Sequence, residues 1–159
     1  KARTIAVSAT DDLGLLKTKR RFDDVAKFRG GKAIGIGETV LKYGISQQVP
    51  NGGLTKGATT ALAGRNLITG RMDTHILGYN AMTWRGNSGG PVLDQSGAVV
   101  GIVSTGRGDY NGAVKSSVAE QFLAVNLVDY AKADSARILD LAGIAQAAEK
   151  YTVVVWCWQ

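Results

Sequence analysis

Hydrophobic residues form short runs over residues 1–115, and Gly, Asn, Asp and Pro separate these runs. Short apolar runs between turn-forming residues are typical of a β-barrel or a β-sandwich. No helix-length period extends across this part. From Ser117 the pattern changes, because Ser117 and Glu120 have the spacing of a capping box, and Phe122 and Val125 follow at helical steps. We therefore expect a β-rich body followed by a helix.

Two further elements are expected in the tail, residues 126–159. Residues 136–148 are rich in alanine and have an apolar face, which predicts a second helix. Residues 151–159 read as an apolar strand with Trp156 and Trp158 on the same side. The simplest interpretation of this tail is a packing appendage. The alternative is that it covers apolar surface left open elsewhere or docks a partner.

The turn with the clearest chemical meaning is Gly86-Asn87-Ser88-Gly89-Gly90-Pro91. Small residues on both sides of Ser88 leave room for its hydroxyl to attack a carbonyl and for backbone amides to donate to the resulting oxyanion. The alternative is a Gly-rich hairpin turn without chemistry. Apolar runs at 92–94 and 98–104 flank a turn at 95–97, so the motif is expected to open a β-hairpin.

This hexapeptide resembles the nucleophile motif of the trypsin-like (chymotrypsin-fold) serine peptidases. Upstream by 76 positions, Asp12-Leu13-Gly14-Leu15-Leu16 resembles the segment that carries the triad aspartate in the HtrA-like and other bacterial-type members. Between them, Val40–Gly44 followed by Gly53–Gly57 resembles a strand pair of the same superfamily. The resemblance covers about residues 3 to 125.

The resemblance implies an all-β, trypsin-like double β-barrel fold. Residues 1–125 would form the peptidase domain, holding the end of the first barrel and all of the second, and residues 126–159 a helical tail ending in an apolar strand. The implied catalytic residues are Ser88 as the nucleophile and Asp12 as the residue that orients the histidine. The implied oxyanion hole is formed by Gly86, Asn87 and Ser88.

The same resemblance implies where a polypeptide substrate binds. Met82 and Thr83 would lie at the base of the primary pocket, and Ser104-Thr105-Gly106 would offer main-chain groups to an extended peptide. The resemblance places no acid at the pocket base, which favours a small or apolar side chain of the substrate. Asp109, in a loop nearby, is the residue that would alter this expectation.

The pattern also requires a histidine upstream of Asp12, and residues 1–11 contain none. The only histidine, His75, lies in an alternating stretch at 71–77 that predicts a strand, so we interpret it as a surface or half-buried strand residue. Since a serine hydroxyl needs a neighbouring base, we expect serine endopeptidase chemistry on Ser88 but an inactive isolated chain. The alternatives are an inactive protease-like module that binds peptides, and an incomplete product without function.

Composition and charge exclude several other classes. With 45% hydrophobic and 20% charged residues, the chain reads as globular, and no apolar run has the length of a membrane span. The net charge of +6 includes a basic run at 17–21 that we interpret as a solvated loop rather than a nucleic-acid site. Cys157 is the only cysteine, so no intrachain disulfide forms. We expect no cofactor and no metal, and a secreted or periplasmic location if a signal sequence precedes Lys1.

Overall fold

The computed structural model describes residues 1–107, 110–133 and 137–156. These residues form twelve strands and two helices. The strands are β1 (Ala2–Val7), β2 (Gly14–Thr18), β3 (Lys27–Arg29), β4 (Thr39–Gly44), β5 (Gly53–Ala61), β6 (Gly64–Arg65), β7 (Met72–Asp73), β8 (Ile76–Tyr79), β9 (Pro91–Leu93), β10 (Val99–Arg107), β11 (Tyr110–Lys115) and β12 (Ala131–Ala133). The helices are α1 (Ser116–Val125) and α2 (Leu141–Tyr151).

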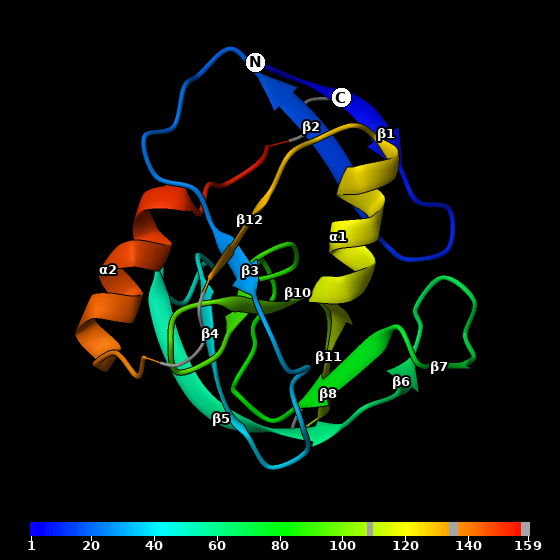
Figure 1. The fold of residues 1–159 in the computed structure, drawn as a ribbon, viewed down its shortest axis with the longest axis vertical. Helices are drawn as coiled ribbons and strands as arrows, with labels where there is room; N and C mark the ends of the chain where they lie inside the picture. Colours follow the sequence, from blue (N-terminus) through cyan, green and yellow to red (C-terminus); the bar gives the residue numbers. More distant parts are fainter. Residues whose placement is uncertain (108–109, 134–136, 157–159) are drawn as a thin grey trace.

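Six strands close a barrel in the order β11, β8, β5, β4, β9, β10, because β10 also pairs with β11 (Figure 1). Every pairing within this ring is antiparallel. β3 and β12 extend the sheet from β10 through parallel pairings. The fold is therefore mostly β with one closed six-stranded barrel, which confirms the predicted fold class.

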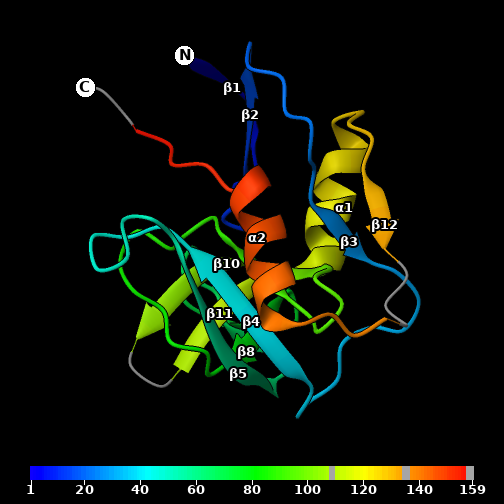
Figure 2. The ribbon, with the colours of Figure 1, turned by 90° about the vertical axis from the view of Figure 1, so that its left-hand side faces the viewer.

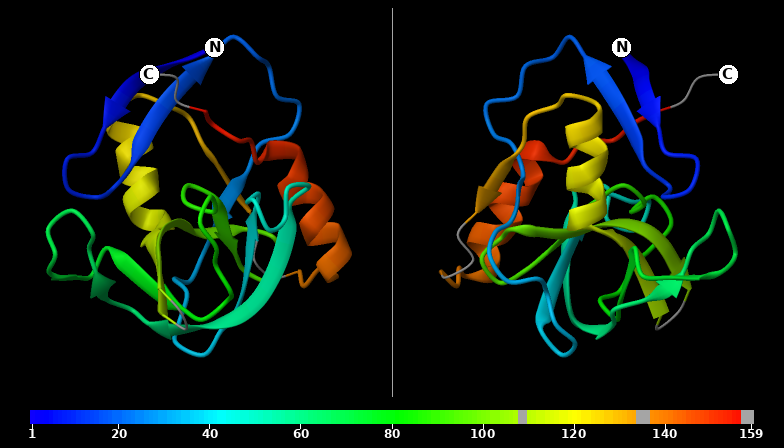
Figure 3. Two further views of the ribbon diagram at one scale, coloured as in Figure 1. Left: turned by 180° about the vertical axis from the view of Figure 1, so that it is seen from behind. Right: turned by 45° about the vertical axis from the view of Figure 1, so that its right-hand side comes forward.

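The strands β1 and β2 form a separate antiparallel hairpin. Figures 1 and 3 show this hairpin at one end of the molecule, beyond α1, with the barrel at the other end. Neither strand pairs with a described barrel strand. Leu13, the last residue of the loop between them, is buried in an apolar cluster that also contains Phe28 and Leu41, so it joins the hairpin to the body.

Alternation along the strands divides the core in two. On β4, Val40 packs in a cluster inside the barrel with Leu77 and Val103. Its neighbour Leu41 packs on the other side, in the cluster that α1 and α2 cover. Figure 2 shows α2 lying along β4 on the outside of the barrel. The predicted hairpin of β9 and β10 and the predicted pair of β4 and β5 are both confirmed.

The first helix differs from expectation at its start. The capping box predicted at Ser117 is wrong, because α1 begins at Ser116 and is preceded by Lys115, which makes no side-chain cap. Glu120, the other member of the predicted box, forms an ion pair of 2.7 Å with Lys132 on β12. Glu120 therefore pairs with a side chain of another element and not with the backbone amide that a capping box requires.

The second helix and the end of the chain also differ. α2 covers 141–151 rather than 136–148, because the Asp140 side chain accepts a hydrogen bond of 2.6 Å from the Gly143 amide and caps the helix there. Residues 152–156 form no strand, and no described strand pairs with them. The rest of the predicted strand, with Cys157 and Trp158, lies outside the described residues. Over the described ranges, no helix is long and apolar enough to cross a membrane.

Candidate active site

The turn predicted to carry the nucleophile, residues 86–91, is held against β10 by main-chain hydrogen bonds. We refer to these residues as the nucleophile turn. The Gly89 amide donates to the Val103 carbonyl at 2.8 Å, and the Val103 amide donates to the Gly90 carbonyl at 2.9 Å. Gly86 and Gly89 have φ angles of 96° and 82°, in the left-handed region where glycine carries no steric penalty. Ser88 lies between them and is exposed.

Some backbone amides of this turn donate hydrogen bonds to the described residues and others do not. The Asn87 amide donates to the Trp84 carbonyl at 3.1 Å. The amides of Gly86 and Ser88 donate to none of the residues that the structure describes. Two unengaged amides on either side of a bonded one are the arrangement that an oxyanion site needs. Of the three residues predicted for that site, Asn87 therefore differs from the other two, because its amide is already bonded within the turn.

Asp12 lies far from Ser88 in sequence but is fastened to the same strand. Ser104 Oγ donates a hydrogen bond of 2.6 Å to Asp12 Oδ2. Ser104 directly follows Val103, the residue bonded to the nucleophile turn, so Asp12 and this turn are held by adjacent residues of β10. Asp12 itself is exposed, and its Oδ1 accepts no hydrogen bond from the described residues.

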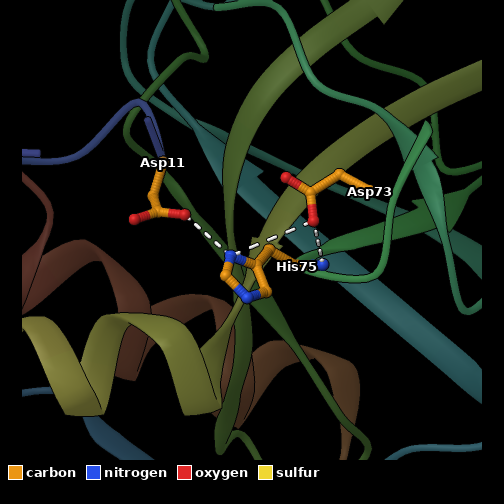
Figure 4. A group of neighbouring side chains, drawn as sticks. All are labelled: Asp11, Asp73 and His75. Carbon is orange, nitrogen blue, oxygen red and sulfur yellow. Dashed lines mark hydrogen bonds and ion pairs between the residues drawn. The ribbon is translucent and has the colours of Figure 1, made fainter. Parts of the chain in front are cut away.

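No described side chain takes the position of a base beside the nucleophile, because the Ser88 hydroxyl has no hydrogen-bond partner among the described residues. His75 bonds elsewhere: its Nδ1 lies 2.8 Å from Asp11 Oδ1, and its side chain is 51% exposed (Figure 4). The strand predicted at 71–77 is broken at Thr74 and His75, which form a turn between β7 and β8. The cause is local, since the Asp73 carboxylate accepts a hydrogen bond from the His75 amide at 2.8 Å.

Residues 1–102 of this sequence match the protein family described as "Trypsin-like peptidase domain". The chain belongs to the trypsin-like peptidase family.

Three similar proteins extend this result. The uncharacterized protein y4bJ of Sinorhizobium fredii is 29% identical over 98% of this chain, which includes the tail, and over 26% of its own length. A probable periplasmic serine endoprotease, DegP-like, of Bartonella henselae is 34% identical over 64% of this chain and 20% of its own length. The solved structure of the HtrA-type protease AlgW with a decapeptide superimposes with a TM-score of 0.68 at 22% identity, over 79% of this chain and 40% of that one.

These comparisons show how much of each relative the chain covers. It spans about a quarter of the length of the first curated relative and a fifth of the second. The structural similarity supports the trypsin-like fold, and the sequence similarity supports the HtrA-like branch.

A buried lysine supports the nucleophile turn of this trypsin-like domain. Lys42 Nζ donates to Asn87 Oδ1 at 2.8 Å and lies 4.8 Å from the centroid of the Trp84 ring. The Trp84 amide donates to the same Asn87 oxygen at 3.0 Å. Lys42 is fully buried, and this burial lowers its pKa to about 8. The sequence placed Lys42 in a strand that resembles one of the family but indicated no role for it at the site, although a lysine within an apolar strand is the signal that could have found it.

A cavity of about 990 Å³ adjoins the turn. Residues 85–91 form one side of it, and apolar side chains that include Ile45 and Ile102 form another. The tail contributes 151–156 to its lining, which places that segment beside the nucleophile turn. Sequence reasoning offered covering of apolar surface only as an alternative for the tail and did not connect it with Ser88.

The residues predicted for the primary pocket lie together only in part. Thr83 Oγ1 bonds Tyr79 Oη at 3.0 Å, and its methyl group lies close to Gly106. Met82 is 60% exposed. Asn111, fully buried beside Gly106, donates to a main-chain carbonyl while its Oδ1 has no partner among the described residues. Asp109 lies outside the described residues.

The predicted peptide-binding strand has one open edge. Over Ser104-Thr105-Gly106, β10 pairs with β11 in the register Thr105 to Gly112 and Gly106 to Asn111. On its other edge, the pairing with β9 extends only as far as Ile102. No described strand covers that edge beyond Val103, so a peptide could add to it.

A set of possible metal ligands lies apart from this turn. Asp11, Asp73 and His75 place one ligand atom each within 4.8 Å of the others. All three side chains already hydrogen-bond to protein groups, and His75 is largely exposed. The arrangement is accounted for by these bonds.

Proposed function

We propose that this chain supplies the nucleophile and the orienting aspartate of a serine endopeptidase. The hydrogen bond from Ser104 to Asp12 carries the proposal, because it brings the aspartate onto the strand that holds the nucleophile turn. Ser88 is the nucleophile, and the unengaged amides of Gly86 and Ser88 receive the oxyanion of the tetrahedral intermediate. The open Oδ1 of Asp12 accepts the N–H of the catalytic imidazole.

The base itself comes from outside residues 1–159. The only histidine of the sequence bonds Asp11, and the Ser88 hydroxyl has no partner among the described residues. We propose that a histidine in sequence preceding Lys1, or in another protein chain, supplies the imidazole. Without it, Ser88 reacts slowly, since loss of the triad histidine costs about a million-fold in turnover in subtilisin.

The proposed substrate is a polypeptide that binds as an added strand. It lies along the open edge of β10 over Ser104, Thr105 and Gly106, and main-chain hydrogen bonds hold it with little demand on sequence. The similar AlgW structure contains a decapeptide, which supports a peptide as the ligand. The lack of an acid at the predicted pocket base, Met82 and Thr83, favours a small or apolar side chain of the substrate. The DegP-like relative is described as periplasmic, and we propose the same compartment here.

The test is turnover of an unfolded protein such as casein by the reading frame extended upstream of Lys1. Ser88→Ala should abolish cleavage, and Asp12→Asn should reduce it roughly ten-thousand-fold, the effect known for the chymotrypsin-type triad. A folded, histidine-containing protein that cleaves nothing, or that cleaves equally well as Ser88→Ala, would show that the peptidase assignment is wrong.

A second candidate function is a peptide-binding module without catalysis. The observation in its favour is the open edge of β10 together with a serine that has no base beside it. Short apolar peptides titrated into the isolated chain should then shift the amide resonances of residues 103–106. If no peptide moves these resonances, the module hypothesis fails.

A further inference from the structure

Three consecutive residues of the loop between β1 and β2 are each held by a different segment of the chain: the loop after β6, the turn between β7 and β8, and β10. The Thr10 carbonyl accepts a hydrogen bond of 2.8 Å from Asn66 Nδ2. Asp11 Oδ1 lies 2.8 Å from His75 Nδ1, which must be the donor because an ionised carboxylate only accepts. Asp12 Oδ2 accepts the bond from Ser104. The loop that presents the proposed catalytic aspartate is thus fastened at three successive positions.

The two anchors outside β10 support each other through Asp73. Asn66 is 1% exposed, and its Nδ2 also donates to Asp73 Oδ2 at 2.8 Å. The other carboxylate oxygen, Asp73 Oδ1, accepts from the His75 amide and fixes the turn that carries the imidazole. Figure 4 shows Asp73 and Asp11 on two sides of the His75 ring. Asp73 therefore fixes the backbone turn from which the imidazole reaches Asp11.

The loop needs such support because its own conformation is unfavourable. Asp12 has a φ angle of 55°, in the left-handed region, which aspartate adopts more readily than most L-residues but less readily than glycine. The hairpin that carries the loop pairs with no described barrel strand. Local bonds between Ser8 and Asp11, in which each residue donates once to the other, shape the loop but do not join it to the rest of the domain. Asn66, His75 and Ser104 make that connection.

We propose that His75 is a positioning residue. It holds Asp11 so that the neighbouring Asp12 stays bonded to Ser104 on β10, the strand that also holds the turn carrying Ser88. The proposal rests on the function proposed above for Asp12. It gives the only histidine of the chain a role at the site without contact with the reacting atoms.

The geometry provides a test with two matched substitutions. The side-chain nitrogen of asparagine occupies the place of His Nδ1, whereas that of glutamine occupies the place of Nε2. His75→Asn should therefore keep the bond to Asp11, and His75→Gln should lose it as His75→Ala does. Thr74→Ala, at an exposed neighbour with no hydrogen bond to the described residues, is the control.

The first measurement is amide hydrogen exchange in the isolated chain, at Ser8, whose amide donates to the Leu13 carbonyl at 2.8 Å, and at Asp11. Exchange at both should rise about five-fold in His75→Ala and His75→Gln, the factor that one net hydrogen bond implies. It should stay at the wild-type rate in His75→Asn and Thr74→Ala. Equal rates in His75→Ala and wild type, or a rise in His75→Asn equal to that in His75→Ala, would overturn the proposal.

The second measurement uses the extended protein. There His75→Ala should lower kcat by roughly 10- to 100-fold with KM unchanged, because a displaced aspartate affects the transition state and not the peptide-binding edge of β10. His75→Asn should restore kcat, and an unaltered kcat in His75→Ala would overturn the proposal. If the extended protein has no activity that depends on Ser88, the proposed function fails, while the exchange rates still decide whether His75 holds the loop.

Discussion

Lys42 Nζ and Asn87 Oδ1 lie 2.8 Å apart with both residues buried, so an amine from the barrel interior holds the nucleophile turn from behind. Water is excluded from this contact, and the cost of keeping a charged amine there appears as the lowered pKa of Lys42. The same contact therefore contributes to the stability of the domain and to the conformation of the turn that carries Ser88.

The first prediction concerns the effect of alkaline pH on stability. The pKa of Lys42 falls from 10.5 to about 8 on folding, so between these values the unfolded chain binds the additional proton and stability rises with pH. The rise should reach about 3 kcal/mol in wild type relative to Lys42→Met. Urea unfolding of both proteins between pH 7.5 and 10.5 measures it. Parallel curves for the two proteins would contradict the prediction.

The second prediction concerns the anchor of the aspartate. Ser104→Ala removes the donor to Asp12 and should lower the free energy of unfolding by about 1.5–3 kcal/mol, the range for a hydrogen bond to a charged group. In the Asp12→Asn background the same substitution should cost less. A double-mutant cycle by denaturant unfolding gives the coupling. Additive effects would show that the bond of 2.6 Å contributes nothing in solution.

The third prediction concerns acid. Burial alone would raise the pKa of Asp11, but hydrogen bonds from His75, Ser8 and Thr10 outweigh it and the pKa is lowered from 3.8. Asp11 therefore stabilises the fold above pH 3.8, and this contribution is lost as the pH falls through the lowered value. Asp11→Asn should flatten the acid branch of a stability curve measured from pH 6 to 2.

Asp23→Asn is the control for this measurement, because Asp23 is exposed and has no hydrogen bond to the described residues. The acid branch of the stability curve of Asp23→Asn should coincide with that of the wild-type protein. Should Asp11→Asn follow wild type as well, the bonds to the Asp11 carboxylate do not stabilise the folded chain.

The fourth prediction separates backbone strain at the site from strain elsewhere. Gly89 and Gly97 have φ angles of 82° and 79°, and alanine at either should cost roughly 1–2 kcal/mol of stability. Gly89→Ala should also slow fluorophosphonate labelling of Ser88 in the extended protein, since Gly89 ties the turn to Val103. Gly97→Ala, in the turn between β9 and β10, should leave the labelling rate unchanged. Equal labelling in both variants would show that the turn tolerates the strain.

Local chemistry made much of this protein predictable. The hairpin of β9 and β10 and the pair of β4 and β5 follow from alternating apolar residues between turn formers, and both formed as expected. The nucleophile motif sits at the start of that hairpin, and its family follows from it. The roles of Ser88 and Asp12 remain predictions, although Asp12 and the turn that carries Ser88 are bonded to adjacent residues of β10.

Amino-acid sequence by itself therefore determined the β-rich class, the hairpins and the nucleophile turn, because each depends on neighbours a few positions apart. Only the tertiary structure decided the partners of Lys42, His75 and Glu120, because each bond joins two different elements, and the bonds of Lys42 and His75 join residues far apart in the chain. It also decided that residues 152–156 form no strand, because an apolar run becomes a strand only where another strand pairs with it.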